Sequence, residues 1–234
     1  MIRINKYLAS LGIASRRKVD DLILQGKISI NGVVLKELGT KVDPDKDDIR
    51  VNGNSIQEQN DFVYIVLNKP RGVISSASDE HGRQTVVDLV KSTVRIFPVG
   101  RLDQESEGLI LLTNNGALTN NLTHPKFHIS KTYHVLIEGL LSDSQLEKLQ
   151  TGVILKDGLT APAEVRVLEA GKKSLIEIVL HEGRNRQIRR MCSELNIQLR
   201  NLKRVKIGEV GLGDLALGKF RDLTPEEISS LVSS

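Results

Sequence analysis

The stretch 99–114 constrains the fold more than any other part of the sequence, because it joins a charged turn to an aliphatic run. Leu109–Leu112 is short, apolar and bounded by turn residues, which predicts a buried β-strand. Asp103 lies six residues before this run, between Gly100 and Gly108. A short loop at the edge of a buried strand holds a carboxylate rigidly and partly desolvates it, as a reactive carboxylate requires. The spacing alone also fits the commoner case of a solvated acidic loop.

The distribution of charge predicts a polyanionic partner. The 234 residues suffice for one large domain, or for a small domain followed by a medium one, and the net charge is only +4. However, residues 1–31 hold six Lys and Arg against two Asp, and residues 181–206 hold eight Lys and Arg against two Glu. Two basic clusters in a mildly basic protein indicate a polyanion that is contacted at two places.

Several classes of protein are disfavoured by residue types that are scarce. The single cysteine, Cys192, excludes an internal disulfide and a thiolate metal site, which fits a reducing compartment. His124 and His128 flank a proline without nearby Cys, Asp or Glu, so we expect no metal. The sequence has neither a signal peptide nor an apolar run of transmembrane length, which predicts a cytoplasmic protein with no membrane contact.

The first sixty residues predict a small domain with two helices and short strands. Apolar residues recur at helical spacing from Ile4 to Leu11, and Ser15 is the expected N-cap of a second helix. Asn31-Gly32 between two β-prone runs indicates a tight hairpin, and a further strand is expected at 48–51. A polar linker is placed at 56–61.

Three cations follow the Ser15 cap, at Arg16, Arg17 and Lys18. Cations in the first turn of a helix oppose its dipole, at a cost of about 0.3–1 kcal/mol each. A phosphate docked at this helix start would use both the backbone N–H groups and the cations. A solvated basic face is the alternative.

The rest of the chain alternates β-prone and helical patterns. The residues Asn68–Gly72 are expected to break the first β-prone run. Strands are expected at 62–67, 131–137, 153–156, 163–168 and 174–180. Helices are expected at 85–90, 117–122, 142–149, through the basic segment 184–195, and after Thr224. No strand is assigned to the tail from Leu199, where Lys203, Arg204 and Lys206 are taken as further contacts to the polyanion.

The second basic cluster contains the best candidate partner for Asp103. Ile188, Met191, Cys192 and Leu195 form the buried face of the expected helix. Arg189 lies beside that face and can reach a half-buried carboxylate, with Arg184 as the second candidate. The residues left to meet phosphates are Arg184, Arg186 and Arg190.

The amino-acid sequence of residues 99–114 resembles a known active-site signature. Gly-Arg-Leu-Asp, Ser-Glu-Gly-Leu and Leu-Leu-Thr-Asn are similar to the signature of pseudouridine synthases of the RsuA/RluB family, which modify single sites in ribosomal RNA. Asn115-Gly116 departs from the usual Asp-Gly of the family, at a turn position that accepts Asn. The resemblance implies that Asp103 is the catalytic aspartate, that Tyr133 is the active-site tyrosine and that Arg189 pairs with Asp103. It also places Lys69, of Lys-Pro-Arg-Gly, in an active-site wall beside the RNA.

A second resemblance covers roughly residues 1–55. Leu-Ala-Ser-Leu-Gly-Ile-Ala-Ser-Arg-Arg-Lys and Gly-Lys-Ile-Ser-Ile-Asn-Gly are similar to the small S-four-type (alpha-L) RNA-binding domain. The resemblance implies that six residues face structured RNA: Ser15, Arg16, Arg17, Lys18, Lys27 and Asn31. Because RNA duplexes are gripped by shape and phosphate, this domain is expected to supply affinity and placement.

Together the two resemblances imply an α+β protein. We expect an alpha-L domain with its linker at 1–60 and a synthase domain at 61–234, built on a mainly antiparallel mixed sheet with flanking helices. The expected reaction converts a uridine of ribosomal RNA, flipped out of a structured stem-loop, to pseudouridine without a cofactor. Arg101 is expected to occupy the space that the base leaves, and a monomer is the default.

Three alternatives stay open at this point. A large-subunit ribosomal RNA target fits best, and a small-subunit target of the RsuA type is the nearest alternative. A non-catalytic RNA-binding assembly factor would also carry these features. Glu105 or Glu107 beside Asp103 permits the carboxylate pair of a glycosidase, but no aromatic sugar platform is evident.

Overall fold

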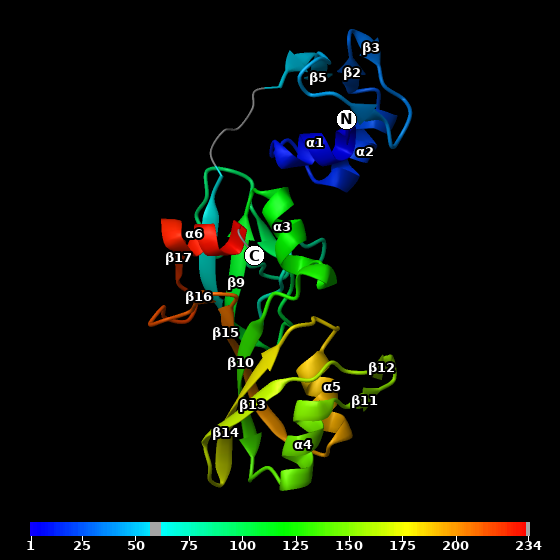
Figure 1. Cartoon of the computed structure of the whole chain (residues 1–234). Coiled ribbons are helices and arrows are strands. Elements are labelled where there is room, and N and C mark those ends of the chain that lie inside the picture. The colour runs from blue at the N-terminus through cyan, green and yellow to red at the C-terminus, as the bar shows by residue number, and fades with distance from the viewer. Residues whose placement is uncertain (57–61, 233–234) are drawn as a thin grey trace. The chain divides into compact units, whose positions relative to one another are not determined.

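The computed structural model describes residues 1–56 and 62–232. The chain forms two compact units (Figure 1). Unit 1 comprises Met1–Val63 with the short segments Ser92–Ile96 and Asn114–Gly116, and unit 2 comprises the rest. The linker predicted at 56–61 lies, beyond Ile56, outside the described residues. In the described part of the chain, no helix is long and apolar enough to cross a membrane.

Unit 1 has the predicted helices and hairpin. Its elements are β1 (Ile2–Arg3), α1 (Ile4–Ser10), α2 (Arg16–Leu24), β2 (Ile28–Ile30), β3 (Val33–Val34), β4 (Lys41–Val42), β5 (Ile49–Val51) and β6 (Asn54–Ser55). The Ser15 side chain accepts a hydrogen bond from the backbone N–H of Lys18, which confirms the N-cap. Asn31 and Gly32 adopt φ values of 51° and 81°, as a tight β2–β3 hairpin requires. Residues of α1, α2 and the strands close one apolar core around Leu8 and Ile23.

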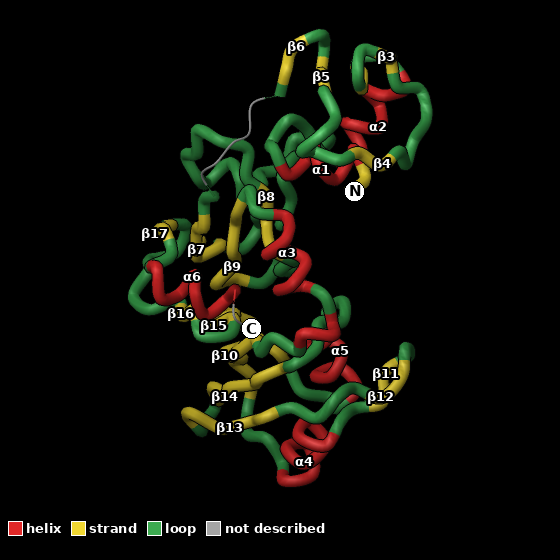
Figure 2. Tube along the Cα trace, turned by 45° about the horizontal axis from the view of Figure 1, so that its top comes forward, coloured by secondary structure: helices red, strands yellow, loops and turns green. Residues whose placement is uncertain are grey.

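Unit 2 is built on a mixed sheet that is antiparallel except at one pair of neighbours. Along the sheet the order is β13-β14-β10-β15-β9-β7-β17, and only β15 and β9 run parallel among the described pairs. Figure 2 shows these strands in yellow, with the helices in red. The strands are β7 (Tyr64–Lys69), β8 (Phe97–Val99), β9 (Glu107–Thr113), β10 (Lys131–Glu138), β11 (Ile154–Leu155), β12 (Gly158–Leu159), β13 (Glu164–Glu169), β14 (Lys173–Leu180), β15 (Leu199–Ile207), β16 (Val210–Gly211) and β17 (Phe220–Asp222).

The helices of unit 2 close two apolar cores. They are α3 (Gly116–Thr123), the short 3-10 turn Pro125–Phe127, α4 (Asp143–Thr151), α5 (Gln187–Glu194) and α6 (Pro225–Val232). Side chains of α4 and α5 pack with β10, β13 and β14 in one core. Side chains of α3 and α6 pack with β7, β9 and β15 in the other. The central strand β9, predicted from Leu109–Leu112, is buried along almost its whole length.

Four local predictions were wrong. Residues 85–90 form a turn instead of a helix, in which the Asp88 carboxylate accepts hydrogen bonds from the backbone and hydroxyl of Thr85. Asn68 and Lys69 do not break the strand but end β7, both buried. The tail contains β15, a nine-residue strand inside the sheet. α5 begins at Gln187, so Arg184 and Arg186 precede the helix.

Candidate active site

Asp103 lies on the loop between β8 and β9, where three side chains of unit 2 meet. Its carboxylate is one-quarter exposed, and Oδ2 lies 3.6 Å from Nε of Arg189 and 3.9 Å from Nη1 of Arg186. Arg189 comes from α5, whereas Arg186 adopts a left-handed conformation (φ 50°) directly before that helix. The structure therefore brings Arg189 to Asp103, and it adds Arg186, which the sequence had assigned to phosphates alone.

Arg189 faces Asp103, and it also holds in place the loop that carries Asp103. Nη2 of Arg189 donates to the Ser106 hydroxyl at 2.9 Å and to the Glu105 carbonyl at 3.1 Å. Burial lowers the pKa of the Arg189 guanidinium, the positive charge of Arg186 adds to this effect, and Glu105 and Asp103 oppose it. Ser106 is fully buried, and no pattern in the sequence separated it from its neighbours. Arg189 thus ties the helix to the turn that presents the carboxylate.

The two glutamates near Asp103 are committed to cations. Glu105 Oε2 lies 2.6 Å from Nη1 of Arg186, and this hydrogen bond is the main reason why the pKa of Glu105 is lowered. Glu107 accepts a hydrogen bond from Asn201 at 2.9 Å and lies 3.8 Å from Nε of Arg71. Since each glutamate has its own positive or amide partner, neither forms a glycosidase-like pair with Asp103.

Two hollows border Asp103. The smaller, here called the Asp103 pocket, has a volume of about 70 Å³, and its walls include Asp103, Tyr133, Ile188 and Leu202. The larger, here called the outer cleft, has a volume of about 500 Å³ and runs past Ser75, Arg83, Gln104 and Asn185. Arg101, an exposed residue, lines both hollows. The carboxylate therefore lies between a small hollow and a larger one, and both are open to solvent.

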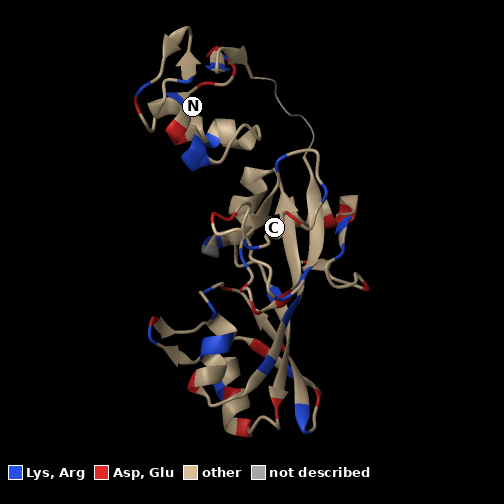
Figure 3. Cartoon of the chain, turned by 180° about the vertical axis from the view of Figure 1, so that it is seen from behind, with Lys and Arg blue, Asp and Glu red and all other residues tan. Residues whose placement is uncertain are grey.

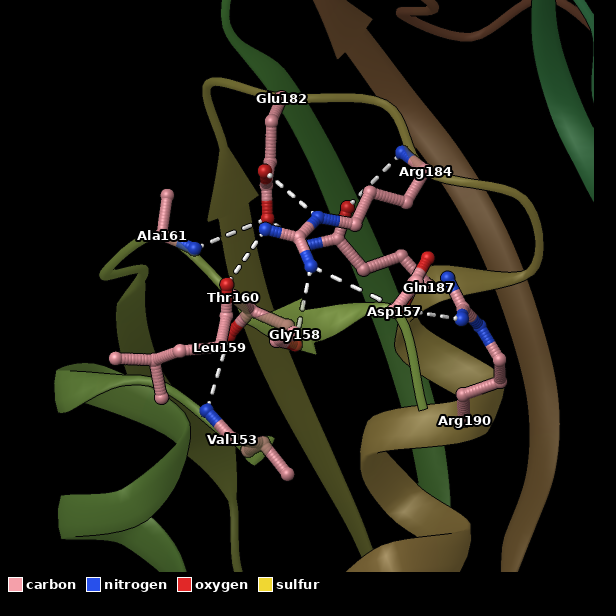
Figure 4. Close-up of polar contacts among 10 residues, drawn as sticks. All are labelled: Val153, Asp157, Gly158, Leu159, Thr160, Ala161, Glu182, Arg184, Gln187 and Arg190. Atoms are coloured by element: carbon pink, nitrogen blue, oxygen red, sulfur yellow. Dashed lines mark hydrogen bonds and ion pairs between the residues drawn. The ribbon is translucent and has the colours of Figure 1, made fainter. Parts of the chain in front are cut away.

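Arg184 and Arg190 form contacts within the protein (Figure 4), and Arg184 also lines the Asp103 pocket. Arg184 donates to Glu182 at 3.1 Å and to the carbonyls of Gly158 and Leu159 at 3.1 and 2.6 Å. Arg190 donates to Asp157 at 2.8 Å. These contacts pin the β11–β12 hairpin to α5, while both arginine side chains stay partly exposed. The contacts also leave Arg189 as the helix arginine at Asp103.

Lys69 is fully buried, which contradicts its assignment as an RNA contact. Its Nζ donates to the carbonyls of Pro70 at 2.9 Å and Val73 at 2.8 Å, and it lies 3.5 Å from the carbonyl of Gln104. Desolvation lowers its pKa to about 8, although the charge of Asp103 works in the opposite direction. From its buried position, the Lys69 side chain links the end of β7 to the loop that carries Asp103.

Arg204 is also buried, at 4% exposure, so it does not belong to an exposed basic surface. Its Nε donates to the carbonyl of Leu109 at 2.8 Å, across the parallel pair of strands β15 and β9. Lys206 pairs with Glu209 at 3.0 Å. A run of basic residues was taken as a surface, whereas it belongs to a strand in the middle of the sheet.

Unit 1 carries its own basic surface at the start of α2, where the ribbon is blue in Figure 3. Arg16, Arg17, Lys18 and Lys27 are exposed, and within the described residues none of them forms an ion pair. Asn31 is also exposed. Its amide donates to Asp47 at 3.0 Å and accepts from the backbone of Asp48 at 2.9 Å, so both ends of the amide hold the turn to the segment before β5.

Comparisons with known proteins identify the family of the chain. Residues 63–194 match the model of the RNA pseudouridylate synthase family, and residues 2–49 match the S4 domain. Ribosomal large subunit pseudouridine synthase B of Bacillus subtilis (strain 168) is 45% identical over 99% of this chain and 96% of its own length. A dual-specificity RNA pseudouridine synthase, RluF of Escherichia coli O6:H1, is 38% identical over 98% of this chain and 78% of its own. A crystal structure of a pseudouridylate synthase superposes with a TM-score of 0.72 at 28% identity, covering 99% of this chain and all of the other.

The fold and the site define an enzyme that modifies RNA, with an S4 domain ahead of a catalytic domain. The chain belongs to the RNA pseudouridylate synthase family, as the sequence resemblance implied. The expected α+β class, with a mainly antiparallel mixed sheet, is confirmed.

Proposed function

We propose that the protein converts a uridine of large-subunit (23S) ribosomal RNA to pseudouridine. The observation that carries this proposal is the Asp103 carboxylate, which faces Arg189 at 3.6 Å on the border between the small pocket and the outer cleft. The identity of 45% with a large-subunit synthase favours the 23S target. A small-subunit (16S) target is the second candidate, because the sequence also resembles the RsuA type of synthase.

In the proposed reaction the uridine leaves its stack, because no side chain reaches the ribose within a helix. The bond from uracil N1 to ribose C1′ breaks, the uracil turns, and C5 bonds to C1′. C5 loses its proton and N1 gains one, so the composition of the nucleotide is unchanged and no cofactor takes part. The outer cleft has the room for the RNA strand, and the Asp103 pocket receives the uracil.

Each site residue has one task in this proposal. Asp103 acts at the ribose, as nucleophile or as general base, and the Arg189 guanidinium holds it in place from 3.6 Å. Tyr133 stacks on the uracil from the pocket wall, beside the face where the C5 proton leaves. Arg101, at the border of both hollows, fills the space that the flipped base vacates in the RNA.

We further propose that the S-four-type domain, with its linker, occupies residues 1–60 and that the catalytic domain occupies 61–234. The exposed cations Arg16, Arg17, Lys18 and Lys27 then bind the phosphates of a structured stem-loop, while the catalytic domain selects the uridine. The enzyme acts as a monomer, because one chain carries every residue to which the proposal gives a task. It acts in the cytoplasm.

The test compares the unchanged protein with Asp103→Asn on ribosomal RNA from a strain that lacks the gene. Pseudouridine positions are mapped in 16S and 23S RNA, and RNA affinity is measured separately. We expect one new 23S position with the unchanged protein, none with Asp103→Asn, and equal RNA affinity. Product in 16S RNA alone would overturn the subunit assignment. No product in either RNA from the unchanged protein would favour a binding role in ribosome assembly.

A further inference from the structure

A second cavity, here called the Lys131 cavity, lies beside the Asp103 pocket in unit 2. It has a volume of about 170 Å³ and shares Arg101, Tyr133 and Arg184 with the Asp103 pocket. Lys131 and Arg204 line this cavity but not the Asp103 pocket. The reaction at Asp103 leaves this space unused, although the space adjoins the site where the uridine reacts.

The Lys131 cavity holds more buried positive charge than its own acids balance. Arg204 is 4% exposed, and in the described structure its Nη2 is buried without a hydrogen-bond partner. Lys131 donates to the Ile129 carbonyl at 2.7 Å, which uses one of the three N–H groups of an ammonium. Burial lowers the pKa of Lys131, and the charge of Arg204 lowers it further. Two neighbouring cations with free donors are costly to desolvate unless an anion joins them.

The carboxylates near this cavity are engaged elsewhere. Glu182 accepts hydrogen bonds from Arg184 at 3.1 Å, Gln187 at 2.6 Å and the backbone of Ala161 at 3.0 Å. Glu164 lies 3.7 Å from Nε2 of His181. Neither carboxylate therefore neutralises Lys131 and Arg204, and an external anion is the group that this cavity lacks.

One histidine adds a neutral donor to the wall of the cavity. The backbone N–H of Lys126 donates to Nδ1 of His124 at 3.3 Å, so the neutral ring carries its hydrogen on Nε2. His124 lines the cavity together with His128 and His181. A ring N–H beside an ammonium and a guanidinium is the donor set that suits phosphate oxygens.

We propose that the Lys131 cavity binds one backbone phosphate of the substrate RNA, next to the nucleotide that reacts at Asp103. The proposal rests on the proposed function, since it takes RNA as the ligand. The phosphate would hold the strand while the base is flipped, so that binding energy from a group that doesn't react positions the one that does. Lys131 is a positioning residue in this scheme.

The experiment pairs a protein variant with a modified RNA. Short RNAs carrying the mapped uridine are made with a single uncharged methylphosphonate at each position around it, and Kd is measured in an Asp103→Asn background. We expect one position at which the methylphosphonate weakens binding by about tenfold, the range of a lost charge-assisted hydrogen bond. Adding Lys131→Gln should weaken binding of the unmodified RNA by a similar factor and remove the sensitivity at that position alone.

The controls separate this inference from its alternatives. Lys172→Gln removes an exposed lysine elsewhere in unit 2 and should behave like the parent, whereas Lys131→Arg should retain the phosphate sensitivity. If Lys131→Gln fails to fold, the methylphosphonate series on the parent still tests the cavity. The inference is overturned if no position is sensitive, or if sensitivity survives Lys131→Gln. A third outcome also overturns it: no RNA position is sensitive, and inorganic phosphate raises the Tm of the parent but not that of Lys131→Gln. The cavity would then bind free phosphate and not the RNA backbone. Absence of any pseudouridine product would instead count against the proposed function.

Discussion

At the scale of single residues, Arg189 makes contacts that a lysine cannot reproduce. Its guanidinium faces Asp103 and donates at the same time to Ser106 and to the Glu105 carbonyl. Arg189→Lys keeps the charge but loses this fork of donors. We expect kcat at saturating RNA to fall by about tenfold or more, with the Kd for RNA changed by less than about threefold, because the contact acts on the reacting group. Single-turnover rates and a binding assay measure the two effects.

Arg200→Lys is the matched control for that change. Arg200 pairs with Glu138 at 2.7 Å on an exposed part of β15, so its replacement should leave kcat unaltered. Equal losses of kcat in Arg189→Lys and Arg200→Lys would contradict the role given to Arg189.

The buried ammonium of Lys69 predicts a loss of stability on truncation. Lys69→Met leaves the carbonyls of Pro70 and Val73 without the donor that they share, and a buried orphaned carbonyl costs about 1–3 kcal/mol. Removing a desolvated charge offsets part of this cost, so we expect the free energy of unfolding at pH 7 to drop by about 2 kcal/mol. Urea unfolding measures it, and the exposed Lys156→Met should differ from wild type by less than about 0.5 kcal/mol.

The same residue predicts how stability depends on pH. The pKa of Lys69 is about 8 in the folded protein and near the ordinary lysine value of 10.5 in the unfolded chain. Between these values the unfolded chain binds the additional proton, so the contribution of Lys69 to stability increases as pH rises from about 8 to 10.5. The free energy of unfolding of wild type minus that of Lys69→Met should therefore rise across this window. A difference that is flat or falls with pH would contradict the lowered pKa.

At the scale of elements, the parallel contact between β9 and β15 depends on one glycine. Gly108 has a φ of 107°, and a Cβ built on it would lie 2.2 Å from the backbone oxygen of Arg204. Gly108→Ala therefore forces apart the two strands at the point where β9 leaves the Asp103 loop. We expect a loss of about 3 kcal/mol or more in the free energy of unfolding, from overpacking together with backbone strain.

Gly116→Ala provides the comparison for that variant. Gly116 begins α3, and a Cβ there would meet no atom within 4 Å. Because alanine is the better helix former, Gly116→Ala should be neutral or raise Tm slightly. If Gly108→Ala were as stable as Gly116→Ala, the close approach of β9 to Arg204 would be wrong.

The elements that the sequence predicted well are those that local chemistry determines. A cap at Ser15, the Asn31-Gly32 turn and the aliphatic run of β9 each act over a few residues. The strand β15 was missed because its basic residues look like a surface, and only its neighbours show that the Arg204 side chain is paired with a carbonyl of β9. The helix predicted at 85–90 failed for a different, local reason, since the Asp88 carboxylate competes for the backbone N–H of Thr85.

The same distinction between local and long-range chemistry applies to the candidate site. The position of Asp103 between two glycines and the placement of Arg189 beside the buried face of α5 follow from spacing, and the structure puts their side chains 3.6 Å apart. Spacing could not show that Arg186 leaves the helix in a left-handed conformation, or that Glu182 and Asp157 already engage Arg184 and Arg190. The contacts of Arg184 with the Gly158 and Leu159 carbonyls and of Arg190 with Asp157 join segments 25 to 33 residues apart, so the sequence gives no signal for them.

At the scale of the whole molecule, the two basic regions are expected to contribute differently to catalysis. The cations at the start of α2 are exposed, without ion pairs in the described structure, and lie in unit 1, whereas the arginines of unit 2 are mostly bound to protein acceptors. Exposed cations that meet phosphates release counterions, and this makes affinity depend on salt. Unit 1 should therefore govern the salt dependence of RNA binding, and unit 2 should govern the rate of the chemical step.

The triple variant Arg16→Gln/Arg17→Gln/Lys18→Gln tests that division. Each phosphate contact contributes about 0.7–0.9 to the slope of log K against log salt, so the slope should decrease by about 2 if all three contacts are lost. A control with three exposed lysines replaced, Lys36→Gln/Lys41→Gln/Lys172→Gln, removes the same charge and should change the slope much less. Because the triple variant leaves the contacts of Asp103 intact, its kcat at saturating RNA should match wild type while KM rises. Equal slopes for both triple variants would mean that net charge, and not the start of α2, sets the affinity for RNA.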